Sequence, residues 1–323
     1  MDVVSLAEIE GFSVGHQEDP VARTGCTVVL CPAGAVASAY TPGFAPGGRE
    51  MEALKPAGMV QAIHGLTLSG GSAFGLAAAS GVVRRLLEMG AGLDAGAIRV
   101  PVAPGAVIYD YPANRSKGQS PNERMGYEAA VKASQTPLLS GPFGAGYSAR
   151  SGKLGGEELS SHSGIGVFGL TNPSGLKMAA LAVVNPLGSV VNPYSGEIIS
   201  GLRRPGGGLA SRAEILAALE RGGFDRSGRT VLAVVGTNAQ IDKLNAYRLA
   251  RMAGAGIARA IYPAHLMFDG DTVFALSSGQ GPAVDISYLG ALGAEILAEA
   301  IVRSVPPVVE IDPDLTDESG RPA

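Results

Sequence analysis

The abundance of glycine is the feature of this sequence that most limits how the chain can fold. The chain holds 47 glycines and 21 prolines, together 68 of its 323 residues, and they follow no collagen-like period. Such a composition requires many turns and close backbone approaches, which disfavours a simple helical bundle. Tryptophan is absent and Phe and Tyr are few, so small aliphatic side chains must fill a core between closely spaced layers.

Length and charge restrict the class of protein further. A chain of 323 residues suffices for one large domain or two ordinary ones. Its net charge of −4 and pI of about 5.6 lack the basic excess that binds phosphates, so no nucleic-acid partner is expected. A hydrophobic content of 46% against 17% charged residues predicts a compact globular protein.

The start of the chain and its cysteines bear on location. Residues 1–17 show no basic segment followed by an apolar one, and no uninterrupted apolar stretch is long enough to span a bilayer. Cys26 and Cys31 are the only cysteines, and they lack the second pair that a zinc site or disulfide framework requires. We therefore expect buried thiols in a soluble, cytoplasmic protein without a membrane partner.

Strand and helix signals alternate along the chain. Pro-Ala-Gly at 32–34 separates two β-rich runs within 24–40 and predicts a hairpin. Small and apolar residues at helical spacing over 70–92, with Ser72 as N-cap and Gly90 as stop, predict a closely packed helix. Further strands are expected at 105–111, 164–170, 178–185, 230–237 and 271–276, and further helices at 124–134, 211–223, 241–261 and 286–302. The pattern favours a layered α/β fold with a mixed sheet.

The sequence motifs do not support a metal or another cofactor. Residues 164–169 match GxGxxG, but Asn-Pro and Ser-Gly follow where a phosphate-binding helix would start. The HExxH, GxSxG and Walker A motifs are absent. The histidines are scattered without metal-ligand spacing, and each is expected to be structural: His16, His64, His162 and His265.

Thr230 is a candidate nucleophile. Where no histidine serves as base, a Ser or Thr at a freed chain N-terminus can use its own α-amine. Thr230 stands where the polar loop 224–229, which contains Gly228, meets an apolar strand. A cut before it would free that amine. Many strands begin with threonine, so the position by itself fits an ordinary strand residue as well.

Asp269 and Asp271 form a second candidate feature, because one glycine separates the two carboxylates just before a strand. Such a pair can orient an ammonium group or accept a hydroxyl proton. Asp-Gly is also common in solvated turns, so the local sequence leaves both interpretations open.

Six segments along the chain carry a resemblance to a known family. They are ARTGCTVVL (22–30), GGREMEALKP (47–56), IHGLTLSGGSAFGLAAASGVVRRLLEMG (63–90), RTVLAVVGTNA (229–239), RLARMAGAGIARAI (248–261) and PAHLMFDGDTVFALSSG (263–279). They closely resemble the L-aminopeptidase/D-esterase family, which includes β-peptidyl aminopeptidases and the nylon-oligomer hydrolases that cut 6-aminohexanoate amides. The likeness covers nearly the whole chain except its tail.

The resemblance implies a fold and a processing event. Members have an αββα four-layer sandwich like that of N-terminal-nucleophile hydrolases, and they split themselves before a Ser or Thr that begins a central strand. Thr230 matches that residue, which implies an α chain of residues 1–229 and a β chain of residues 230–323. We expect a single catalytic domain over 1–305 and a loosely held tail over 306–323.

The resemblance also implies catalytic roles around Thr230. Asp269 and Asp271 match the acidic pair of the threonine-type branch and would hold the amine and hydroxyl of Thr230. Lys153 matches the basic residue after the glycine-rich block, and its charge would favour an unprotonated amine.

The remaining matches concern the oxyanion and the cleavage point. Asn185 and Tyr109 would stabilise the tetrahedral oxyanion. Tyr111 is an alternative to Tyr109, because it lies on the same face if the strand continues. Arg229 departs from the family pattern, which has Asn before the cleaved bond in this branch and Gly in other members. A bulky charged residue there can slow the self-cleavage or leave it intact.

These observations predict a self-processing, N-terminal-threonine amide hydrolase without a cofactor. Its expected substrates are short peptides, amino-acid amides or esters, and 6-aminohexanoate oligomers. The resemblance also implies a homotetramer or larger homo-oligomer. Two alternatives stay open: an acyltransferase resembling the ornithine acetyltransferases, and a binding protein of the same fold that does not process itself.

Overall fold

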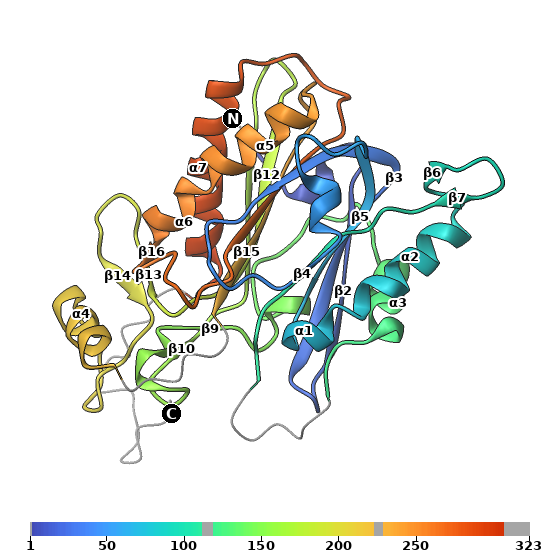
Figure 1. Ribbon diagram of the computed structural model, residues 1–323. Helices are drawn as coiled ribbons and strands as arrows, with labels where there is room; N and C mark the ends of the chain where they lie inside the picture. The colour runs from blue at the N-terminus through green and yellow to red at the C-terminus, as the bar shows by residue number, and fades with distance from the viewer. Residues whose placement is uncertain (1, 112–118, 223–228, 307–323) are drawn as a thin grey trace.

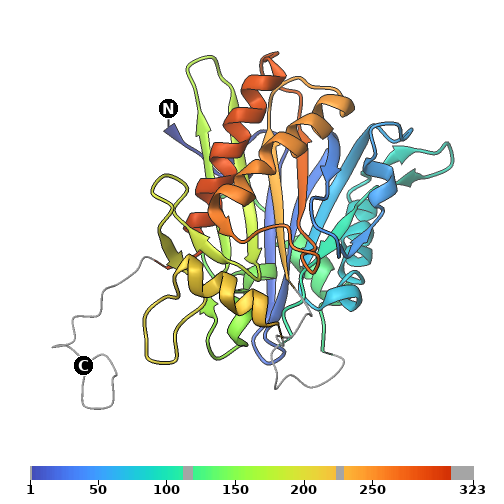
Figure 2. The same cartoon turned by 60° about the vertical axis from the view of Figure 1, so that its left-hand side comes forward.

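Among the described residues, ten strands form one continuous hydrogen-bonded sheet that folds over at β3, so that its two parts, called here the two sheets, lie face to face at the centre of the molecule. Helices cover their outer faces (Figure 1). The computed structural model describes residues 2–111, 119–222 and 229–306. Helices α2 (Ala78–Glu88) and α3 (Glu123–Val131) cover one sheet. The other sheet is covered by α5 (Lys243–Ala253), α6 (Ala255–Ala260) and α7 (Ile286–Arg303), as the turned view also shows (Figure 2). The expected αββα sandwich is confirmed.

The long strand β3 (Thr24–Tyr40) belongs to both sheets. Its first half pairs with β2 (Ser13–Asp19) and β5 (Ala62–Ser69), and its last residues pair with β17 (Thr272–Ser277). The predicted hairpin is therefore wrong. Pro32 cannot donate to the ladder and Gly34 has a φ of +92°, so the pairing with β5 shifts register between Leu30 and Ala35. The strand bends there and continues into the second sheet.

The strand order combines parallel and antiparallel pairs, as predicted. The first sheet runs β1 (Asp2–Val3), β11 (Ile165–Thr171), β12 (Lys177–Asn185), β15 (Thr230–Thr237), β17, β3. The second runs β2, β3, β5, β8 (Gly105–Val107), β4 (Gly48–Arg49). The β15–β17 and β5–β8 pairs are parallel, and β15 lies at the centre of its sheet.

Alternating side chains of β15 point into two different apolar layers. Leu232 and Val234 pack between the sheets. Val231, Ala233 and Val235 pack against α5 and α7. Because both faces are buried, the strand has no polar side chain between its terminal residues Thr230 and Thr237, which explains why its bounds could be predicted from sequence.

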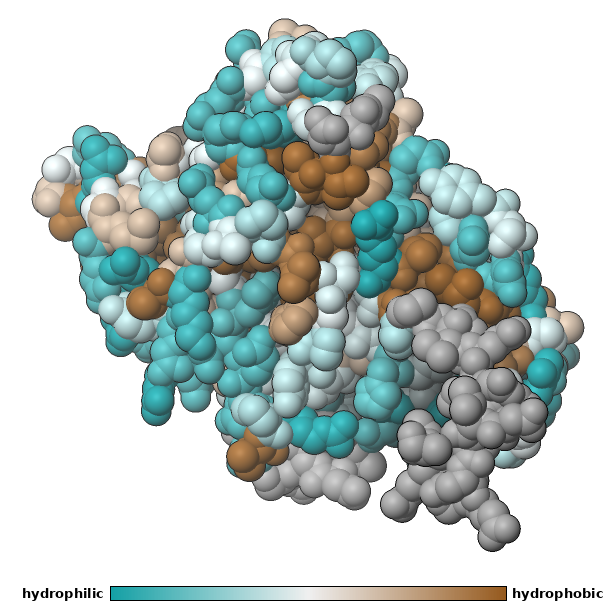
Figure 3. Space-filling view, turned by 180° about the vertical axis from the view of Figure 1, so that it is seen from behind, coloured by the Kyte–Doolittle hydropathy of each residue, from teal (hydrophilic) through white to brown (hydrophobic). Residues whose placement is uncertain are grey.

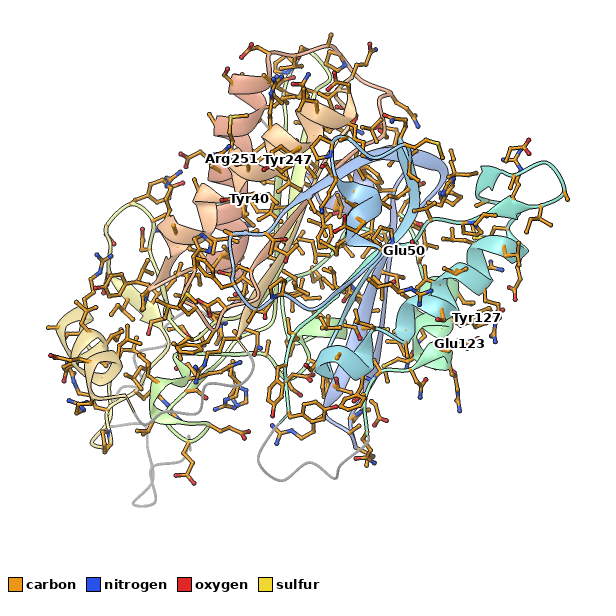
Figure 4. All side chains as sticks on the ribbon, viewed as in Figure 1. Tyr40, Glu50, Glu123, Tyr127, Tyr247 and Arg251 are labelled. Atoms are coloured by element: carbon orange, nitrogen blue, oxygen red, sulfur yellow. The ribbon has the colours of Figure 1, made fainter. Side chains whose placement is uncertain are left out.

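Small residues allow the close packing of helices that the composition predicted. A Cβ atom on Gly81 of α2 would lie 1.9 Å from the carbonyl oxygen of Glu123, and one on Gly126 of α3 would lie 1.9 Å from that of Ala78. On the other side of the molecule, α5 packs on β3, and the rings of Tyr40 and Tyr247 meet edge to face with centroids 6.3 Å apart (Figure 4).

The remaining elements are short and connect the layers. The helix predicted over 70–92 is divided into α1 (Ser72–Gly75) and α2, and Gly71, not Ser72, is the N-cap residue of α1. Helix α4 (Arg212–Arg221) begins with Ser211 as cap, as predicted.

The small sheets contain β6 (Leu93–Asp94), β7 (Arg99–Val100), β9 (Arg150–Ser151), β10 (Ser161–His162), β13 (Ser189–Val191), β14 (Ile198–Ser200) and β16 (Ile261–Tyr262). In the part of the chain that the structure describes, the 3-10 helices are η1 (Leu6–Glu8), η2 (Met51–Leu54), η3 (Gly144–Gly146) and η4 (Lys153–Gly155).

The structure bears on the expected membrane spans, the cysteines and the molecular surface, but not on the oligomeric state or the tail. Within the described ranges, no helix is long and apolar enough to cross a membrane. Cys26 and Cys31 are buried free thiols, and burial raises the pKa of Cys31 to about 12. On the face seen from behind, hydrophobic side chains form separate areas divided by hydrophilic ones (Figure 3). The oligomeric state stays a prediction, and the tail 306–323 lies outside the described residues apart from its first position.

Candidate active site

Thr230 is the first residue of β15 and is only 5% exposed. Its side-chain hydroxyl donates a hydrogen bond of 2.5 Å to the carbonyl oxygen of Arg229. Across the antiparallel β12–β15 pair, Thr230 is in register with Asn185, the last residue of β12. The candidate nucleophile therefore lies against the carbonyl group of the peptide bond that precedes it.

The Asp269–Asp271 loop holds the start of β15 in place. It immediately precedes β17, the parallel neighbour of β15, and Arg229 forms a parallel bridge with Asp269. The backbone N–H of Gly270 donates to the carbonyl oxygen of Arg229 at 2.8 Å. One carboxylate oxygen of Asp271 accepts a 2.7 Å hydrogen bond from the N–H of Val231. The carbonyl oxygen of Arg229 therefore accepts two hydrogen bonds, one from the Thr230 hydroxyl and one from the Gly270 N–H.

Gly270 occupies a position that has no room for a side chain. A Cβ atom there would lie 2.8 Å from Thr230 Oγ1 and 2.8 Å from the carbonyl oxygen of Ala45. The segment around Ala45 covers the loop, because the N–H groups of Gly43 and Ala45 donate to the carbonyl oxygens of Asp271 and Asp269. Glycine is required here by close contact on both sides.

The carboxyl group of Asp269 is buried, with the residue 2% exposed. Its Oδ2 accepts a hydrogen bond of 2.7 Å from the N–H of Leu266, whereas Oδ1 is buried without a hydrogen-bond partner among the described residues. Burial, reinforced by the nearby charge of Asp271, raises the pKa of Asp269 to about 7. The hydrogen bond from Leu266 and the charge of Arg229 oppose this rise. The group can therefore exchange a proton near neutral pH.

His265 is a residue of this site that the sequence interpretation missed. Its Nδ1 lies 2.8 Å from the second carboxylate oxygen of Asp271, which fixes the orientation of that carboxylate. The scattered spacing of the histidines predicts a structural role for each of them and gives no sign of this contact. The signal was its place six residues before Asp271 in one of the segments that carry the resemblance. A separation of six residues does not by itself predict a contact. His265 reaches Asp271 because the chain between them folds back.

Lys153 is the first residue of the 3-10 helix η4, which follows β9. The N–H groups of Gly152 and Lys153 donate to the carbonyl oxygens of Gly188 and Leu187, just after β12. This pairing directs the ammonium group back to Asn185, where it donates to the carbonyl oxygen at 3.1 Å and also to the side-chain Oδ1.

The charge of Lys153 is weaker than the sequence suggested. Burial and then the positive charge of Arg229 lower the pKa of Lys153 to about 7, although Asp110 and Asp269 act in the opposite direction. Only part of the Lys153 population is therefore protonated at neutral pH. A neutral Lys153 amine can accept a proton, a role that is open to few lysines at this pH.

Asn185 and Tyr109 are in contact, but through the backbone of Tyr109. The side-chain amide of Asn185 donates to the carbonyl oxygen of Tyr109 at 3.0 Å. Strand β8 ends at Val107, so the condition under which Tyr111 would share a strand face with Tyr109 is not met. The Tyr111 ring instead packs edge to face on that of Tyr109, with centroids 5.1 Å apart, and its hydroxyl donates to the carbonyl oxygen of Gly71 at 3.2 Å.

The segment that carries the most distinctive part of the resemblance, LSGGSAFGL, borders the site. Asp110, which the sequence interpretation overlooked, accepts hydrogen bonds from Thr24 Oγ1 at 2.7 Å and from the N–H of Gly71 at 2.8 Å. A Cβ atom on Gly70 would lie 2.2 Å from Asp110 and 2.3 Å from Thr24. The glycines of this segment thus let a buried carboxylate lie close to the backbone.

The six residues that the resemblance selected therefore gather around the start of β15: Tyr109, Lys153, Asn185, Thr230, Asp269 and Asp271. They come from segments far apart in the sequence. Their closeness is an observation about geometry, and their catalytic roles stay a prediction.

Comparison with protein families and curated sequences gives matches over almost the whole chain. The profile of peptidase family S58 matches residues 5–309. An uncharacterized aminopeptidase of Mycobacterium tuberculosis (strain ATCC 25618 / H37Rv) is 37% identical and covers 93% of each chain. A 6-aminohexanoate-oligomer endohydrolase of Kocuria sp. (strain KY2) is 27% identical and covers 92% of this chain and 84% of its own.

Comparison with solved structures supports the same fold. A β-aminopeptidase of Burkholderia sp. superposes with a TM-score of 0.68 at 20% identity, covering 93% of this chain and 85% of its own. The L-aminopeptidase D-Ala-esterase/amidase of Ochrobactrum anthropi, described as a variant of the Ntn hydrolase fold, gives 0.67 at 16% identity with the same coverage. The family match includes Thr230 at the start of β15 and the loop before β17 that carries Asp269 and Asp271. The chain belongs to peptidase family S58, a family of amide-bond hydrolases.

Proposed function

We propose that this protein is an amide hydrolase that cuts its own chain between Arg229 and Thr230 and then uses Thr230 as an N-terminal nucleophile. The products are residues 1–229 and 230–323, which remain together in one αββα domain over 1–305. One observation carries the proposal. The Thr230 hydroxyl lies against the Arg229 carbonyl group, whose oxygen also accepts a hydrogen bond from the N–H of Gly270.

Self-cleavage begins with attack of Thr230 Oγ1 on the carbonyl carbon of Arg229. The hydroxyl proton leaves to a base, and negative charge develops on the carbonyl oxygen, which the Gly270 N–H stabilises by roughly 3 kcal/mol. The C–N bond then breaks and its nitrogen gains a proton, which leaves Arg229 as an ester on Oγ1. Water hydrolyses the ester and releases a carboxylate on Arg229 and a free α-amine on Thr230.

In the intact chain that α-amine is still an amide, so another group must accept the first proton. Asp269 and Lys153 both have pKa values of about 7. Each is in part unprotonated at neutral pH, and Oδ1 of Asp269 accepts no hydrogen bond from the described residues. These are properties of a general base.

Turnover of a substrate repeats the chemistry with a different base. The freed Thr230 amine takes the proton from Oγ1 and delivers it to the leaving amine, and water then hydrolyses the acyl-enzyme ester. Asp269 and Asp271 hold the amine and the hydroxyl, while Asn185 and Tyr109 stabilise the oxyanion. The positive charge on the protonated fraction of Lys153 favours the unprotonated form of the Thr230 amine.

The substrates that we propose are short peptides, amino-acid amides or esters, and 6-aminohexanoate oligomers. The relatives named aminopeptidase and 6-aminohexanoate-oligomer endohydrolase support this range. A neutral amine in place of water as acyl acceptor would make the protein an acyltransferase. Product analysis with and without an added amine separates the two activities.

Intact-mass measurement of freshly purified protein tests the proposal. We expect two fragments, residues 1–229 and 230–323, and a sequence beginning with Thr230 at the new N-terminus. Fragments of other boundaries would contradict the choice of Thr230. A single chain of 32.6 kDa that remains stable for days would show that the protein does not process itself.

The rate of self-cleavage should rise with pH through neutrality. The base form of either candidate, neutral Lys153 or ionised Asp269, forms as pH increases past a pKa of about 7. Below that pH we expect about a tenfold gain per pH unit, and above it a plateau. Cell-free translation followed by a gel-based chase at pH 5.5 to 8.5 measures this rate. A rate that falls with increasing pH would exclude both bases, and a Lys153→Met chain with the same profile would leave Asp269 as the base.

A further inference from the structure

His265 and Leu266 are consecutive residues that contact the two carboxylates of the candidate site. The ring Nδ1 of His265 lies 2.8 Å from Oδ2 of Asp271, and the backbone N–H of Leu266 donates to Oδ2 of Asp269 at 2.7 Å. The N–H of Asp269 donates in return to the carbonyl oxygen of Leu266 at 2.9 Å. The segment 265–271 is therefore folded on itself, and its first two residues orient the carboxylates near its end.

The backbone of His265 is left-handed, with a φ of +56°. This conformation is uncommon for residues that carry a side chain, although Asn, Asp and His adopt it more often than most. It turns the chain so that the His265 ring and the N–H of the next residue both reach the Asp269–Asp271 loop. Glycine would adopt the same φ without steric cost. What histidine adds at this position is therefore its ring.

The carboxylate of Asp271 is held at both of its oxygens. The N–H of Val231, the residue after the candidate nucleophile, donates to Oδ1 at 2.7 Å, and the His265 ring contacts Oδ2. When Asp271 is ionised its two oxygens offer about four acceptor sites and no donor, so Nδ1 of His265 carries the proton of this contact. Each oxygen keeps an acceptor site for a further donor. Contacts at two different oxygens fix the plane of the carboxylate and the directions in which it can accept that donor.

We propose that His265 is a positioning residue for the reaction, which holds Asp271 in the orientation that accepts hydrogen bonds from the Thr230 amine and hydroxyl. This inference rests on the proposed function, which gives Asp271 that task. Without the imidazole the carboxylate loses one of these two contacts and can turn about its Cβ–Cγ bond. A displacement of about 1 Å in such a group can cost a factor of about a hundred in rate. Because His265 acts through Asp271, its loss should lower kcat and leave KM nearly unchanged.

Three substitutions that tolerate a positive φ test this role. His265→Gly removes the ring. His265→Asn keeps a side-chain N–H donor near the position of Nδ1, and His265→Asp has the same shape as asparagine but lacks the donor and repels Asp271.

The first measurement is the rate of self-cleavage, followed by cell-free translation and a gel-based chase, because it requires no added substrate. The second is kcat and KM for the p-nitroanilides of alanine and 6-aminohexanoic acid. We expect self-cleavage and kcat to fall by about ten- to a hundredfold in His265→Gly, as for loss of a hydrogen bond to a charged group. His265→Asn should recover most of this loss, His265→Asp should be slowest, and KM should change little.

Glu50→Gly is the matched control for the change in backbone. Glu50 is exposed and has the same φ of +56°, so glycine relieves the same conformation there without removal of the imidazole. We expect this chain to be cut, and to hydrolyse the anilides, at the natural rates. Circular dichroism shows which variants are folded.

Two results would overturn the proposal: a folded His265→Gly protein with natural self-cleavage and natural kcat, or a His265→Asn protein that is no faster than His265→Gly. If His265→Gly does not fold, the comparison of His265→Asn with His265→Asp decides, and equal rates would count against the proposal. A natural chain that is never cut would instead remove the proposed function, so the two failures are distinguishable.

Discussion

Replacement of Thr230 by alanine leaves a single chain of 32.6 kDa that hydrolyses no amide substrate. The reason is that Thr230 Oγ1 is the atom in contact with the Arg229 carbonyl group, and alanine offers no nucleophile for either reaction. The loss should reach the detection limit, a change of at least about a thousandfold. Intact mass and anilide hydrolysis measure the two effects separately.

Thr230→Ser is the matched control, because it keeps the hydroxyl and removes only the methyl group. We expect this chain to be cut, at a reduced rate, and to retain measurable hydrolysis. A Thr230→Ala protein that is still divided into two fragments at this position would remove Thr230 from the role of nucleophile. Since Thr230 is buried in the central strand, circular dichroism must show that both variants are folded.

Gly270→Ala should slow self-cleavage by about a hundredfold or more, the second largest effect that we expect. The added Cβ would lie 2.8 Å from both Thr230 Oγ1 and the Ala45 carbonyl oxygen, so either the nucleophile or the covering segment must move. Movement of the loop would also weaken the hydrogen bond from the Gly270 N–H to the Arg229 carbonyl oxygen. Loss of one such donor costs roughly 3 kcal/mol, a factor of about a hundred or more in rate.

Gly206→Ala provides the comparison for that variant. A Cβ at Gly206 meets nothing within 4 Å, so the substitution adds the same methyl group in open space. We expect the Gly206→Ala chain to be cut at the natural rate. If the Gly270→Ala chain were cut equally fast, while thermal melts showed both proteins folded, the Gly270 N–H would have no part in the reaction.

Much of the fold could be predicted because the relevant signals are local. The apolar run at 230–237 is β15, with the same bounds, and Ser211 forms a capping box with Glu214. The glycines of α2 and α3 produce the close layers that the composition indicated. Each of these features depends on residues within a few positions of one another or on the total content of small residues.

The predictions that failed depended on distant segments. Pro-Ala-Gly at 32–34 has the composition of a turn, but β17 continues the pairing beyond it, so the chain bends and does not reverse. Local residues cannot show that a strand from the other end of the chain will be available as a partner.

The sequence by itself determined the alternating α/β pattern, the start of β15 at Thr230, and, through the family resemblance, the six residues to examine. Only the tertiary structure decided their chemistry. The pKa values of about 7 for Lys153 and Asp269 arise from burial and from charges brought close by folding. The pairing of His265 with Asp271 and the enclosure of Arg229 have the same origin. Desolvation and Coulomb energies depend on distances in space, which the order of residues along a chain does not specify.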